Sequence, residues 1–159
     1  MGKKTMPKLI DLEIPKSWDF VRQIRAKVED ELTDLPISLR YAAGMVASEL
    51  AGNAIKYGDP NGPVPAHLSC EIADKKIVIE VSNYVKSQEL VQEVRSRVDQ
   101  MSSAEDVEAL FIKRLISFLN ETAQGSQLGL YRIGYEGGFN LNSSYQNSIL
   151  TLRATRGIS

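Results

Sequence analysis

The chain has 159 residues, of which 43% are hydrophobic and 25% charged, a composition typical of a globular domain with one core. The net charge is −1, so bulk electrostatics favour neither nucleic acid nor a membrane surface as a partner. No apolar run approaches the roughly 20 residues that span a bilayer. The single cysteine, Cys70, excludes an intrachain disulfide and suits a cytoplasmic protein. With His67 as the only histidine, a structural zinc site lacks its usual ligands.

The first half of the chain alternates between strand-like and helix-like patterns. Apolar and polar residues alternate over 8–14, which predicts a strand with one solvated face. Apolar residues then recur at helical spacing over 18–33 and again over 38–57, predicting two amphipathic helices. A run rich in Gly, Asp and Pro ends the second helix. Two alternating runs follow, 66–72 and 77–81, and predict an antiparallel hairpin.

The second half predicts a helical middle and a second hairpin. The spacing indicates helices within 86–121 and a short helix over 128–136 that stops at two glycines. Strands follow over 139–145 and 148–155, with a turn expected at Gln146–Asn147. Helices on one side of an antiparallel or mixed sheet give an α+β two-layer sandwich. With no linker or repeat in the sequence, we expect residues 1–159 to form one domain.

Two polar residues interrupt the apolar face of the predicted helix 38–57. On a helical wheel centred on Val46, Asn53 falls roughly 20° and Glu49 roughly 60° from the centre. Burying an amide without partners costs about 1–3 kcal/mol. Asn53 therefore either hydrogen-bonds a neighbouring strand or loop, or places its oxygen on a hard cation such as Mg²⁺. Glu49 is either a solvated edge residue or a general base.

The segment from Ser48 to Tyr57 resembles the N-box of the GHKL superfamily, which includes histidine kinases, gyrase-type ATPases and anti-sigma-factor kinases. The matching positions are Glu49, Asn53, Ala54, Lys56 and Tyr57. The resemblance implies that Asn53 binds the metal and that Glu49 is the catalytic general base. It also implies that Lys56 contacts phosphate, although a solvated helix lysine explains that position equally well.

A second segment, 125–130, is similar to the glycine box that closes the ATP lid of this superfamily and opens a helix. Small residues before a helix let backbone N–H groups approach a phosphate. The resemblance implies that Gly125, Gly129 and Leu130 belong to the nucleotide site. Gln127 departs from the pattern, because the superfamily usually has a glycine there.

The third expected element, an Asp-x-Gly-x-Gly box after the strand that follows the N-box, is absent. The chain reads Val81-Ser82-Asn83-Tyr84-Val85-Lys86 at this place. Asn83 either accepts a hydrogen bond from the adenine amino group, more weakly than a carboxylate would, or merely ends the strand.

Together the segments resemble the SiaB-like, anti-sigma-factor kinase branch of the superfamily. The resemblance implies a Bergerat-type (histidine-kinase-like ATPase) fold, with a mixed sheet covered by helices on one face and a helical lid-region insertion at about 86–121. It also implies ATP and Mg²⁺ as cofactors, and phosphoryl transfer to a Ser or Thr of a STAS-domain partner.

Two alternatives stay open at this point. Because the Asp-x-Gly-x-Gly box is missing and Gln127 replaces a glycine, the chain can instead be a degenerate regulatory binding module that does not bind ATP. A third reading is an ATP hydrolase in which Glu49 activates water. Edge strands near Leu9 or Ser148 would permit a homodimer.

Overall fold

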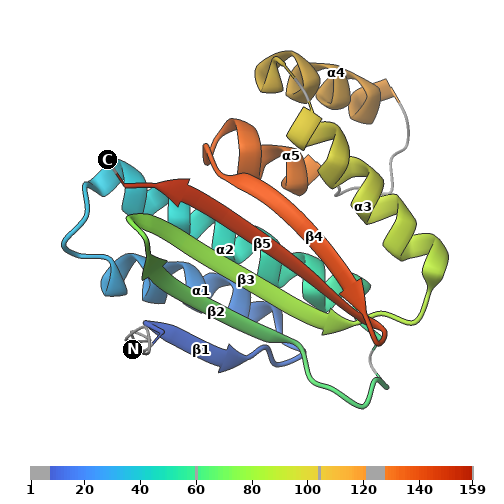
Figure 1. Cartoon of the computed structure of the whole chain (residues 1–159), viewed down its shortest axis with the longest axis horizontal. Coiled ribbons are helices and arrows are strands. Elements are labelled where there is room, and N and C mark those ends of the chain that lie inside the picture. The colour runs from blue at the N-terminus through green and yellow to red at the C-terminus, as the bar shows by residue number, and fades with distance from the viewer. Residues whose placement is uncertain (1–7, 60, 104, 121–127, 159) are drawn as a thin grey trace, which may run out of the picture.

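The computed structural model describes residues 8–59, 61–103, 105–120 and 128–158. Five strands form one sheet in the order β1-β2-β3-β5-β4 (Figure 1). The strands are β1 (Ile10–Glu13), β2 (His67–Ala73), β3 (Lys76–Tyr84), β4 (Asn140–Gln146) and β5 (Ile149–Gly157). The helices are α1 (Trp18–Glu31), α2 (Ile37–Tyr57), α3 (Gln88–Ser103), α4 (Val107–Asn120) and α5 (Leu128–Tyr135). The α+β class predicted from the sequence is confirmed.

The expectation of a mixed sheet is wrong, because every pair of neighbouring strands is antiparallel. Two helices, rather than one, connect β1 to β2, and together they return the chain to the end of the sheet where β1 finished. Strand β2 therefore runs in the opposite direction to β1. Three helices connect β3 to β4, but β5 folds back from β4 and lies between these two strands. No strand therefore gains a parallel neighbour.

Two tight turns close the hairpins. Asp74 and Lys75 have φ values of 52° and 61°, and Asn147 and Ser148 have values of 54° and 64°. Two consecutive residues with positive φ are typical of the type I′ turn, whose twist matches that of the flanking strands. The second turn lies one residue later than the predicted Gln146–Asn147.

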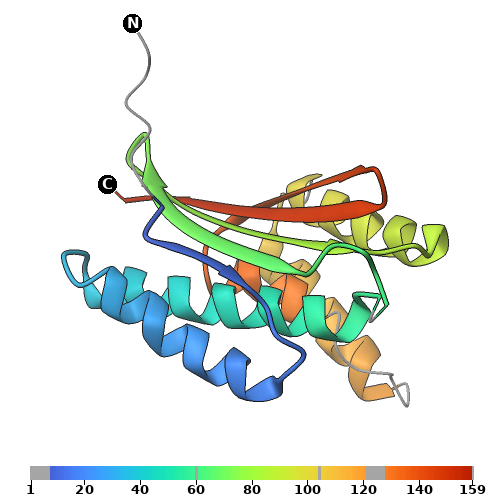
Figure 2. The same cartoon turned by 90° about the horizontal axis from the view of Figure 1, so that it is seen from below.

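The helices cover one face of the sheet and leave the other open (Figure 2). The covered face contributes Cys70 and Ile79, both fully buried, opposite each other in the ladder. The open face carries polar groups, among them Glu80 paired with Arg153 at 3.8 Å. His67 Nε2 lies 2.6 Å from the Asp11 carboxylate. This alternation is what the strand patterns predicted.

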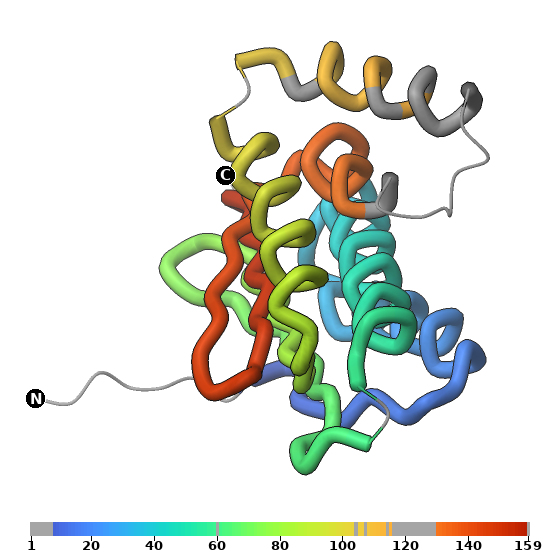
Figure 3. The backbone as a smooth tube through the Cα atoms, turned by 90° about the vertical axis from the view of Figure 1, so that its right-hand side faces the viewer, coloured from blue at the N-terminus to red at the C-terminus, as the bar shows by residue number. Residues whose placement is uncertain are grey.

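The helical middle predicted over 86–121 forms α3 and α4. Helix α3 lies along β4, where Ser102 Oγ donates to the Leu141 carbonyl at 3.2 Å and Arg95 Nε donates to Ser143 Oγ at 3.2 Å. Helix α4 packs against α5 through the stacked rings of Phe111 and Tyr135, whose centroids are 4.8 Å apart (Figure 3). Helix α3 thereby covers the outer edge of β4.

Candidate functional site

Helix α2 carries the N-box residues and lies between α1 and α5 beneath the sheet (Figure 2). Its small buried residues, including Ala43, Ala47 and Ala51, let the helix approach its neighbours closely. The helix ends where the Gly58 N–H donates to the Ala54 carbonyl at 2.9 Å. This placement directs one stripe of α2 into the core and brings Asn53 into that stripe.

Asn53 is buried, at 9% exposure, and its Nδ2 has no hydrogen-bond partner among the described residues. It faces a cavity of about 10 Å³. The apolar residues that line this cavity come from five elements: Leu50 of α2, Val81 of β3, Val94 of α3, Leu130 of α5, and Leu150 and Leu152 of β5. A space of that size holds about one water molecule.

Glu49 lies one helical turn before Asn53 but meets different neighbours. Its Oε1 accepts a hydrogen bond from Arg132 Nη1 of α5 at 2.7 Å. Arg132 also donates to Glu136 Oε2, at 2.9 Å from Nη2. Burial raises the pKa of Glu49, and the charge of Arg132 opposes this shift only in part. The pKa of Arg132 is raised, first by its hydrogen bond to Glu136 and further by the charge of Glu49.

Arg132 is a site residue that the sequence reasoning missed. Its spacing from Glu136 predicts an ion pair within one helix, since residues four apart face each other. The contact with Glu49 spans 83 residues of sequence and depends on how α5 packs against α2. No local pattern contains that information.

Of the other predicted site residues, some line the cavity beside Asn53 and others lie outside it. Asn83 is buried at the end of β3 and lines the same cavity as Asn53, as does Leu130. Lys56 is exposed, with Nζ 5.4 Å from the centroid of the Tyr57 ring. Gly129 lies in the first turn of α5, whereas Gly125 is outside the described residues. The fold thus brings Asn53, Asn83 and Leu130 together.

The cavity that the described residues form beside Asn53 is too small for magnesium-ATP. The buried amide of Asn53 suits a polar ligand, but the cavity beside it is about 10 Å³, whereas small-molecule pockets measure about 300–1,000 Å³. Val94 of α3 is among the side chains that line this cavity. Within the described part of the chain, no group of three or more His, Cys, Asp or Glu side chains is placed to hold a metal ion.

Comparison with known proteins adds no family. No family model matches the chain, and no curated protein matches its sequence. Among the described helices, none has the length and apolar character needed to cross a membrane. Function is therefore inferred from the geometry around α2.

Proposed function

We propose that the chain is a regulatory binding module with a GHKL-like, Bergerat-type sandwich, which binds a STAS-like protein without binding ATP. The observation that carries this proposal is the small space beside Asn53, the residue that the resemblance assigns to Mg²⁺. Its amide faces apolar side chains and a cavity of about 10 Å³. Such a cavity admits a water molecule but no nucleotide.

The state of Glu49 supports the same proposal. A general base needs an acceptor oxygen directed at the hydroxyl that it deprotonates. Glu49 Oε1 instead accepts a hydrogen bond from Arg132 at 2.7 Å, so an ion pair between α2 and α5 uses this carboxylate. A structural role for Glu49, holding α5 against α2, accounts for the contact without a reaction.

The end of β3 is also poorly suited to a base-specific nucleotide contact. Asn83 stands where the superfamily has an aspartate, and a neutral amide accepts a hydrogen bond more weakly than a carboxylate. The two glycine positions of the box are occupied by Val85 and Ser87. The sequence departs from the family pattern at the residues whose chemistry nucleotide binding requires.

The experiment is a binding assay with purified STAS-domain proteins of the source organism, measured by calorimetry with and without magnesium-ATP. The proposal predicts a complex whose affinity is the same in both conditions. A complex that forms only with ATP, or phosphate transfer to the partner, would contradict nucleotide independence. Failure of every STAS-domain protein to bind would contradict the partner class.

One observation favours a second candidate, the anti-sigma-factor type of protein kinase. Nδ2 of Asn53 is buried without a partner in the described structure, at the position where the N-box pattern has its metal ligand. An unpaired buried amide costs about 1–3 kcal/mol, which a polar ligand would recover. A kinase would require α3 to move away from α2, and it predicts phosphate transfer that Asn53→Ala abolishes.

A further inference from the structure

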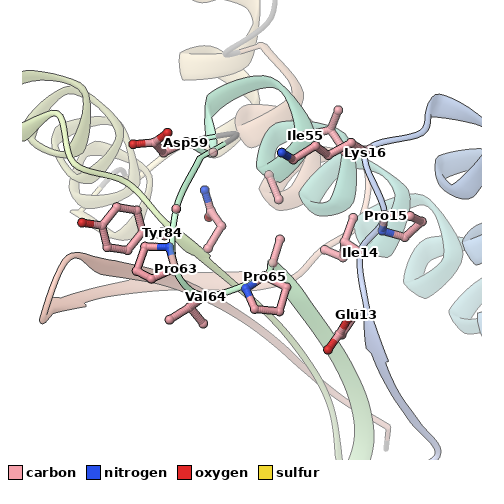
Figure 4. Close-up of a pocket in the computed structure, with 15 residues that line it drawn as sticks. Glu13, Ile14, Pro15, Lys16, Ile55, Asp59, Pro63, Val64, Pro65 and Tyr84 are labelled. Atoms are coloured by element: carbon pink, nitrogen blue, oxygen red, sulfur yellow. The ribbon is translucent and has the colours of Figure 1, made fainter.

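A cleft of about 470 Å³ opens at the end of α2, between the β1–α1 connection and the segment 62–66. It adjoins the small cavity that Asn53 lines, and Ala54 and Asn83 line both spaces. Figure 4 shows Tyr84, Pro63, Val64 and Pro65 along one side of the cleft, and Ile14, Pro15 and Glu13 along the other. The volume falls within the range of small-molecule sites.

Contacts within the loop and with Tyr84 fix one wall of this cleft in the absence of a ligand. The Asp59 N–H donates to the Tyr84 carbonyl at 2.9 Å, and Asp59 Oδ1 accepts from the Asn61 N–H at 3.0 Å. Gly62 lies on the Tyr84 ring so closely that a Cβ there would be 2.7 Å from Cδ1. The wall formed by Tyr84 is therefore fixed by the sequence of the loop, as preorganised binding sites require.

The last turn of α2 contains a carbonyl acceptor without its helical partner. In a continuing helix the Asp59 N–H would donate to the Ile55 carbonyl, but here it donates to Tyr84. The Ile55 carbonyl thus lacks its helical partner, and Ile55 lines the cleft. The C-terminal end of a helix also carries a partial negative charge, which favours a cation nearby.

The remaining lining is rich in acceptors and poor in donors. Pro15, Pro63 and Pro65 have no backbone N–H, so these wall positions offer only carbonyl groups. The Glu13 carboxylate forms no ion pair within the described ranges. Lys16 also lines the cleft, but its side chain already has an interaction within the chain. A ligand with N–H donors and a positive charge matches this lining.

Asn83 gives an independent reason to expect a ligand in the cleft. The residue is buried, at 7% exposure, and no hydrogen bond joins its side chain to the part of the chain that the structure describes. Nδ2 lies next to Gly58, where a Cβ would come within 3.1 Å of it. Both residues line the cleft. A ligand group in the cleft would give this amide a hydrogen-bond partner.

We propose that this cleft binds a small organic ammonium ion with a planar apolar body. The ammonium group donates hydrogen bonds to the acceptors at the end of α2, to Asn83 and to Glu13. The apolar body packs against Tyr84 and the prolines, since an aromatic ring also attracts a nearby cation. The cleft shares Asn83 with the N-box cavity, but the proposed ligand requires neither nucleotide binding nor a STAS-like partner.

The test is a titration followed in amide ¹H–¹⁵N NMR spectra, with phenethylamine as the probe. The expected result is saturable shifts at the amides of Gly58, Gly62 and Val64, with a dissociation constant on the order of 1 mM. 2-Phenylethanol, which is neutral, should bind at least about threefold more weakly. 3-Phenylpropionate, which carries the opposite charge, should not shift these signals.

Matched variants locate the site. Glu13→Gln should weaken phenethylamine binding about threefold, and Asn83→Leu about tenfold, each with a folded spectrum. Glu71→Gln removes a carboxylate of β2 that does not line the cleft and should leave binding unchanged. Equal binding of the three probes, shifts outside the cleft, no shifts at about 10 mM, or an equal loss in Glu71→Gln would overturn the proposal.

Discussion

Asn53 and Glu49 lie one turn apart on α2, yet packing gives them opposite electrostatic surroundings. Asn53 faces Leu50, Val94 and Leu130 with its Nδ2 unpaired, whereas Glu49 is paired with Arg132. A buried amide without a partner reduces stability, and a buried carboxylate with one cation is only partly compensated. Each residue therefore makes its own prediction.

Replacing Asn53 with leucine should leave the protein equally stable or stabilise it by up to about 2 kcal/mol, because the change removes an unpaired buried amide and keeps the same number of side-chain heavy atoms. Urea denaturation measures the free energy of unfolding. Leu50→Ala, on the same helix and fully buried, is the matched control and should cost about 2–5 kcal/mol. A loss above about 1 kcal/mol in Asn53→Leu would show that the amide is hydrogen-bonded.

The pKa of Glu49 should lie above its ordinary value of 4.5, because burial disfavours the carboxylate more than Arg132 favours it. Arg132→Met should raise this pKa further, and Glu136→Gln should lower it, since the charge of Glu136 acts in the raising direction. Carbon-detected NMR titration of the Glu49 carboxyl group measures all three. Opposite signs in the two variants would contradict the assigned ion-pair network.

The raised pKa of Glu49 also makes the stability of the protein depend on pH. A folded-state pKa above the unfolded value means that the native state binds the proton more tightly. The stabilisation from protonated Glu49 is therefore complete below about pH 4.5 and is lost as pH rises through the raised folded-state pKa. Glu49→Gln should flatten this part of the pH profile of unfolding free energy.

At the level of single residues, the sequence predicted the location of Asn53 but not its surroundings. Helical spacing placed Asn53 in the apolar stripe, which the structure confirms with 9% exposure. The closing contacts from Val94 and Leu130 come from helices distant in sequence, and so does Arg132. Whether a polar residue in an apolar stripe meets a cleft or a packed wall depends on these non-local contacts.

The elements themselves follow closely from local patterns. Both hairpins and α2 were predicted within a few residues, because period-two and period-3.6 spacing record the same burial that the structure imposes. The sheet was harder to predict, since strand order depends on how β5 inserts between β3 and β4. A sequence pattern specifies that a strand is buried, but it does not specify its neighbour.

The β4–β5 turn offers a test of element geometry. Ser148 has a φ of 64°, a conformation that glycine adopts without steric cost, and Asn147–Gly is the preferred type I′ pair. Ser148→Gly should stabilise the protein by about 0.5–1 kcal/mol, measured by denaturant unfolding. Ser148→Ala, which keeps a Cβ, is the control and should give no gain. A loss of stability in the glycine variant would contradict the assigned turn.

At the scale of the whole molecule, one layer of helices protects one face of the sheet. Cys70 lies on that face in β2, is fully buried, and pairs with Ile10 and Ile79 of the neighbouring strands. Reaching its thiol requires the sheet and the helices to separate. The single cysteine therefore reports on opening of the core rather than on a local fluctuation.

Native Cys70 should resist alkylation at pH 8, because burial raises the pKa of its thiol to about 12 and excludes the reagent. The rate of labelling by iodoacetamide should rise only with denaturant concentrations that unfold the chain. The double variant Cys70→Ala and Ser96→Cys, with its thiol on the exposed surface of α3, should react within minutes. Equally fast labelling of the native chain would show that the helical layer opens.

The central claim for the whole molecule is that the space beside Asn53, next to α3, is too small for a nucleotide. Calorimetric titration of the intact chain with millimolar magnesium-ATP measures this directly. The closed cavity of about 10 Å³ predicts no binding heat beyond dilution, for the native chain and for Asn53→Ala alike. Saturable binding by the native chain that Asn53→Ala abolishes would contradict the account and would establish a nucleotide site at α2.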